Sequence, residues 1–85
     1  MMNTLHRINR ILELHKLIKE GSTGSSADLS IRLQVSRRSV QDYLDELRIL
    51  GAQILYDSIH RTYYYVNKFD IKYHLDIIVG EKENK

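Results

Sequence analysis

The stretch from residue 29 to residue 50 constrains this chain most, because it holds two helical patterns separated by only a short turn. Ser36 stands between the two patterns, and a serine there can cap the second helix by accepting a hydrogen bond from one of its first amides. After it, Val40, Leu44 and Leu47 recur at the three- and four-residue spacing that keeps side chains on one helical face. We therefore expect a helix, a tight turn and a second helix whose apolar face packs into a core.

The opposite face of this second helix is polar, and its first turn carries two arginines. A guanidinium offers a fixed fork of donors that matches O6 and N7 of guanine, and a glutamine side chain can pair with adenine. Base contacts in the major groove are usually made from the first turn of such a helix. Acidic residues offset the arginines further along, so only the beginning of the helix is clearly basic. The candidate DNA-contacting residues here are Ser36, Arg37, Arg38, Ser39, Gln41 and Asp42.

The same stretch resembles the winged helix-turn-helix domains of bacterial transcription regulators, in particular the DeoR-like and biotin-repressor-like group. The resemblance is carried by the run LSIRLQVSRRSV at residues 29–40, followed by Leu44, Leu47 and Gly51, and it covers about residues 7–66. It implies an α+β fold of three helices and a β-hairpin, the wing, with the third helix in the major groove and the wing on the flanking backbone.

Three positions depart from the pattern of that group. Ser30 replaces a small alanine where two helices approach, and Asp42 stands where a basic residue is common. Gln34 replaces the glycine of the turn, so we expect a non-glycine residue to adopt a left-handed backbone there at some energetic cost.

Hydrophobic periodicity and helix-stop signals predict the elements of the whole chain, which we expect to be one winged helix-turn-helix domain over residues 1–85. Two β-type runs on either side of a short polar segment predict the hairpin. The expected helices are residues 3–20, 26–33 and 37–50, and the expected hairpin strands are residues 53–56 and 62–66.

Two further places offer candidate contacts to the DNA backbone. Ser25 or Ser26 can cap the second helix, and a helix N-terminus also attracts phosphate, so these serines either cap only or cap and touch the backbone. His60 and Arg61 lie near the expected tip of the wing, where a positive charge would meet phosphates.

We expect the tyrosines after the hairpin turn and the histidine of the first helix to serve the structure rather than to contact a partner. Tyr64 is expected to face the core together with the residues two positions away on either side, which leaves Tyr63 and Tyr65 pointing outward. His15 falls in the middle of the apolar arc of the first helix, and we expect a partly buried histidine with a local hydrogen bond.

Residues 69–79 alternate between apolar and polar side chains, the period-two pattern of a half-buried strand. A strand of this length needs a pairing partner, which is either the wing of the same chain or the same strand in a second copy. The sequence thus predicts an additional C-terminal strand. In the second case it predicts a homodimer formed through the first helix and this strand.

Composition limits the function further. Eighty-five residues with 42% hydrophobic content fit one small domain, and the formal charge of +2 is compatible with a polyanionic partner. The chain lacks cysteine and has no apolar run approaching the roughly 20 residues of a membrane span, so we expect a cytoplasmic protein.

No phosphate-binding glycine loop, nucleophile elbow or metal-ligand spacing appears, and we expect neither an enzyme nor a cofactor. The favoured function is sequence-specific binding of double-stranded DNA by a small transcription regulator. The alternative is a protein-protein interaction or dimerisation module of the same fold that does not bind DNA. The offsetting charges along the third helix and the unexplained residues 69–79 support that alternative.

Overall fold

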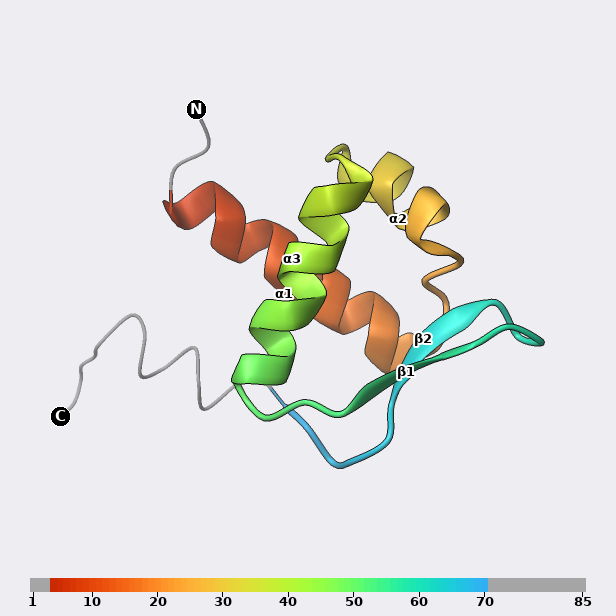
Figure 1. The fold of residues 1–85 in the computed structure, drawn as a ribbon. Helices are drawn as coiled ribbons and strands as arrows, with labels where there is room; N and C mark the ends of the chain where they lie inside the picture. Colours follow the sequence, from red (N-terminus) through yellow and green to blue (C-terminus); the bar gives the residue numbers. More distant parts are fainter. Residues whose placement is uncertain (1–3, 71–85) are drawn as a thin grey trace, which may run out of the picture.

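The computed structural model describes residues 4–70 of the chain. Within this range the fold is α+β: three helices precede a two-stranded antiparallel hairpin. Figure 1 shows α3 crossing α1, with the hairpin beside the C-terminal end of α1. None of the described helices is long and apolar enough to cross a membrane. The elements are α1 (Thr4–Glu20), α2 (Ser26–Leu33), α3 (Arg37–Ile49), β1 (Ile54–Asp57) and β2 (Thr62–Tyr65).

Helices α2 and α3 begin at the serines that the sequence predicts as caps. The Ser25 hydroxyl accepts a hydrogen bond from the backbone N–H of Asp28 at 3.2 Å, and the Asp28 carboxylate accepts one from the N–H of Ser25 at 2.9 Å. At the start of α3, the Ser36 hydroxyl accepts from the N–H of Ser39 at 3.0 Å. These bonds satisfy amides that every helix start leaves without a partner.

Gln34 ends α2 in the left-handed conformation, with φ of 57°, as expected for a residue in the place of a turn glycine. Its backbone N–H donates to the carbonyl of Ile31 at 3.2 Å, and the N–H of Val35 donates to the carbonyl of Ser30 at 3.0 Å. The chain therefore reverses direction within a few residues, and α3 packs directly against α2.

The core lies where the three helices meet the hairpin. The apolar face of α3 that the sequence predicts is buried, and α1 contributes Leu14 and Ile18 from its apolar arc. On α2 the core positions are Leu29 and Leu33, while Ile31 is exposed. The buried apolar residues are Leu14, Ile18, Leu29, Leu33, Val40, Tyr43, Leu44, Leu47, Ala52, Ile54 and Phe69.

The hairpin packs against the helices with the face opposite to the one expected. Tyr63 and Tyr65 lie against the core, and Tyr64 is exposed. The register pairs the buried Ile54 with Tyr65, so these two side chains share the inner face. The prediction about which face packs inward was wrong. Thr62 lies on the same face as Tyr64 and is buried, but it is buried by a contact with the loop before α2 and not by the core. Alternation along a strand defines two faces and leaves open which of them meets a helix.

The expected C-terminal strand is not present in the part that the structure describes. Phe69 and Asp70 lie outside any strand, because the N–H of Phe69 donates to the carbonyl of Asn67 at 3.0 Å and bends the chain. Phe69 is buried, and its ring meets the ring of His15 edge-on with centroids 5.8 Å apart. The remainder of the expected strand, residues 71–79, lies outside the described residues.

Candidate nucleic-acid interface

The first turns of α3 present the two arginines to solvent. Arg37, Arg38, Gln41 and Asp42 are all exposed, and within residues 4–70 their side chains form no hydrogen bond or ion pair. The Ser36 cap contributes a second polar contact, because its hydroxyl donates to that of Ser39 at 3.1 Å. The buried face of α3 fixes the helix from behind, so these side chains are held outward and available to a partner.

Further along α3, acidic residues are neutralised within the chain. Arg48 lies 3.1 Å from the carboxylate of Asp45, and Arg7 of α1 lies 2.7 Å from the carboxylate of Glu46. Acids and bases are equal in number along α3, but two of the three acids are already paired with arginines. The charge exposed to a partner at the first turns of α3 is therefore more positive than this count suggests. Asp42 is the acid that stays without an ion pair among the described residues of α3, and the two arginines of the first turn stay unpaired beside it.

The hairpin turn is held by one carboxylate. Asp57 accepts hydrogen bonds from the N–H of Ile59 at 2.9 Å and of His60 at 3.2 Å, and its other oxygen lies 2.6 Å from Nδ1 of His60. These bonds, with that of the His60 ring first, hold the pKa of Asp57 below its usual value. Arg61 then adopts a left-handed conformation with φ of 55°, so the tip turns without a glycine. His60, predicted as a contact to the DNA backbone, bonds to Asp57 within its own turn, and its side chain is 76% exposed.

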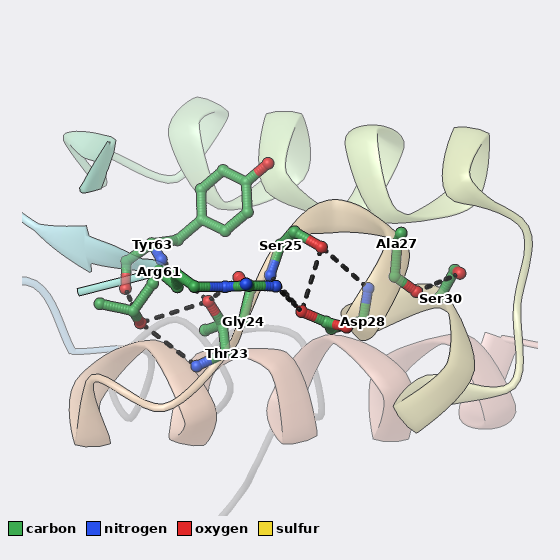
Figure 2. Close-up of polar contacts among 9 residues, drawn as sticks. Thr23, Gly24, Ser25, Ala27, Asp28, Ser30, Arg61 and Tyr63 are labelled. Atoms are coloured by element: carbon green, nitrogen blue, oxygen red, sulfur yellow. Dashed lines mark hydrogen bonds and ion pairs between the residues drawn. The ribbon is translucent and has the colours of Figure 1, made fainter. Parts of the chain in front are cut away.

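Arg61 reaches back from the hairpin toward α2 (Figure 2). Its Nη2 atom lies 3.5 Å from the Asp28 carboxylate at the start of α2, although the Arg61 side chain is mostly exposed. The bonds to Ser25 hold the pKa of Asp28 below its usual value, and Arg61 adds to this lowering. The structure thus places Ser25 and Arg61, predicted separately, around one carboxylate. The Ser25 hydroxyl serves as a cap there, and Ser26 is half-buried beside it.

The sequence gives no sign of the contact that fastens the hairpin to this region. Thr23, fully buried in the loop before α2, donates from its backbone N–H to the Thr62 hydroxyl at 3.2 Å. The N–H of Tyr63 donates in turn to the Thr23 hydroxyl at 2.8 Å. Figure 2 shows Thr23 and Tyr63 next to the contact between Asp28 and Arg61. The hairpin and the N-terminus of α2 are therefore one structural unit, which a search for local motifs cannot detect.

One buried titratable group lies away from this surface. His15 is 7% exposed; its Nδ1 atom lies 2.7 Å from the Tyr65 hydroxyl and its Nε2 atom 3.6 Å from the Asp70 carboxylate. Burial lowers the pKa of His15, and it raises the pKa of the Tyr65 hydroxyl. The sequence predicted a partly buried histidine with a local hydrogen bond, whereas the structure buries His15 and gives it a hydrogen-bond partner on a distant strand. No group of His, Asp and Glu side chains within residues 4–70 is arranged to hold a metal ion.

The chain was compared with models of protein families, with curated proteins and with solved structures, and none of the three comparisons finds a match. The candidate interface has two parts. One is the exposed first turns of α3, and the other is the hairpin tip with the start of α2, which the Thr23 contact joins.

Proposed function

We propose that this chain is a winged helix-turn-helix domain that binds double-stranded DNA sequence-specifically, as a small, non-catalytic transcription regulator of the cytoplasm. The observation that supports this most is the pair of exposed guanidiniums of Arg37 and Arg38, which form no ion pair with any of residues 4–70, on a helix whose other face is buried. A helix fixed in this way can enter the major groove with its N-terminal residues toward the base edges. The hairpin then lies against the flanking backbone.

The proposed roles follow from side-chain chemistry. Arg37 and Arg38 bind base edges or phosphates, and Gln41 pairs with a base. The hydroxyls of Ser36 and Ser39 lie beside them and offer short polar contacts to the backbone. From the second unit, Arg61 supplies a cation for a phosphate, with His60 beside it.

Binding of a fluorescein-labelled random-sequence duplex at low salt tests the proposal. A DNA-binding domain should bind such a duplex non-specifically, and affinity should fall steeply with salt because counterions are released. The Arg37→Ala/Arg38→Ala variant should lose most of this affinity. Lys16→Ala/Lys68→Ala removes the same charge from exposed residues outside α3 and serves as the control. An unchanged affinity in the double arginine variant would contradict the assignment of α3.

A second candidate function is a protein-protein interaction or dimerisation module, with a second copy of the chain as partner. It is favoured by Leu55, Tyr64 and Val66, which are 55%, 38% and 54% exposed. The register puts Leu55 opposite Tyr64, on the face of the hairpin turned away from the helices. Tyr64 also lines a groove of about 530 Å³, together with residues at the end of α1 and with Asp70. Sedimentation at micromolar concentration tests the homodimer, and a monomer would exclude it.

A further inference from the structure

The carboxylate of Asp28 is the point where α2, the preceding loop and the hairpin meet (Figure 2). Its Oδ2 atom accepts hydrogen bonds from the backbone N–H of Ser25 at 2.9 Å and from the Ser25 hydroxyl at 3.1 Å. Gly24 packs against the same oxygen so closely that a Cβ there would lie 2.6 Å from it. The first turn of α2 therefore fixes the carboxylate, and this holds without any help from Arg61.

The two partners of the ion pair differ in how firmly they are held. Asp28 is charged at neutral pH, and its bonds to Ser25 lower its pKa further. Arg61 lies 3.5 Å away with its side chain 70% exposed, and an ion pair so open to solvent contributes little. Moving the guanidinium away from the carboxylate therefore costs little free energy, whereas the carboxylate is held in place by Ser25.

We propose that Asp28 limits the affinity of this surface for DNA by competing with a backbone phosphate for the Arg61 guanidinium. The inference rests on the proposed function, in which Arg61 contacts the backbone. In the free chain Asp28 neutralises Arg61. In the complex a phosphate takes the guanidinium and lies close to a fixed negative charge, and this repulsion lowers affinity.

The test compares Asp28→Asn with wild type in duplex binding over a series of salt concentrations. An asparagine oxygen can still accept the N–H of Ser25, so the cap is retained and the charge is lost. We expect Asp28→Asn to bind about 3- to 10-fold more tightly, because one like-charge repulsion is removed at an exposed site. Glu13→Gln, at an exposed position of α1, changes the net charge equally and should leave affinity nearly unchanged.

Arg61→Ala separates an effect through Arg61 from a general effect of charge. This variant should bind more weakly and reduce the slope of log affinity against log salt by about 0.9, the value for one phosphate contact. Asp28→Asn should bring a much smaller gain when it is added to Arg61→Ala. An equal gain in both backgrounds, or no gain from Asp28→Asn in a chain that melts like wild type, would overturn the inference.

A heparin column distinguishes failure of the inference from failure of the proposed function. Heparin is a polyanion that can bind Arg61 without any DNA-specific geometry. If wild type binds no duplex, the proposed function fails. Later elution of Asp28→Asn than of wild type and Glu13→Gln, lost in the Arg61→Ala background, would still support competition for Arg61. Co-elution of Asp28→Asn with wild type would reject it.

Discussion

The Tyr65 hydroxyl of β2 lies 2.7 Å from Nδ1 of His15, a ring that is almost completely buried on α1. Burial raises the pKa of Tyr65, which favours the protonated hydroxyl. This hydroxyl can donate a hydrogen bond to Nδ1 of a neutral His15 ring. In the tautomer that accepts this bond at Nδ1, the proton is on Nε2, which lies 3.6 Å from the Asp70 carboxylate. The arrangement suits the neutral histidine, and it joins α1 to the hairpin.

The first prediction concerns pH. The pKa of His15 is lowered by burial and by Lys19, which outweigh the nearby Asp70, so the unfolded chain takes up the proton more readily than the folded one. Stability should be complete above the ordinary histidine value of 6.5 and should fall as pH drops below it. Thermal unfolding between pH 7.5 and pH 5.5 measures this. His15→Gln can still hydrogen-bond but cannot titrate, and its melting temperature should depend less on pH. Equal slopes for both proteins would contradict the prediction.

The second prediction separates the two arginines. Arg37→Ala and Arg38→Ala should each weaken duplex binding, and the one that contacts a base should also lose about 1 to 3 kcal/mol of discrimination at that base pair. The other should lower affinity equally for all sequences and reduce the salt dependence. Selection of duplex sites from a random pool, followed by binding of single-base variants, measures both effects. Loss of affinity without loss of preference in both variants would assign both arginines to phosphates.

The third prediction tests the attachment of the hairpin. Thr23→Val keeps the shape of the buried side chain but removes the hydroxyl that accepts the N–H of Tyr63 at 2.8 Å. A buried donor without a partner costs about 1 to 3 kcal/mol, so the free energy of unfolding in urea should fall by this amount. Ser22→Ala, an exposed hydroxyl next to it in sequence, should change stability little. If the two variants are equally stable, the threonine contact does not hold the hairpin.

The fourth prediction concerns the turn between α2 and α3. Gln34 has φ of 57°, a conformation that a side chain disfavours and glycine does not. Gln34→Gly should therefore raise the free energy of unfolding by about 0.5 to 1 kcal/mol. Relief of the left-handed strain is worth roughly 1 to 2 kcal/mol, and the added conformational entropy of glycine in the unfolded chain offsets about 0.5 to 1 kcal/mol of it. Gln41→Gly, within α3, should lower it by about 1 kcal/mol. A loss of stability in both variants would show that the turn is not strained.

The sequence predicted those elements whose causes are local. Ser25 and Ser36 fix the starts of α2 and α3 through bonds to residues three positions away, and Gln34 ends α2 at the expected place. The apolar spacing along α3 identified its buried face. Such features depend on a few consecutive residues, which periodicity and capping rules describe.

The features that sequence did not predict depend on contacts between distant residues. The face of the hairpin that packs inward is set by α1, and Thr62 is buried because it meets Thr23 across a separation of 39 residues. The ion pairs of Arg61 with Asp28 and of Glu46 with Arg7 also join residues that are far apart in the sequence. For the candidate interface, the sequence predicted that the arginines of α3 are contact residues. Whether they are free to bind a partner depends on ion pairs that the acidic residues of α3 form with other arginines.

The bonds between Thr23 and β2 also affect how the molecule meets a partner. A hairpin that is fastened to the core has already given up most of its conformational freedom when the chain folds. Docking it against a second molecule then costs little additional ordering, so more of the contact energy remains available as affinity. The spacing between the hairpin tip and the arginines is likewise set in advance, which makes the surface selective for partners whose own charges repeat at that distance.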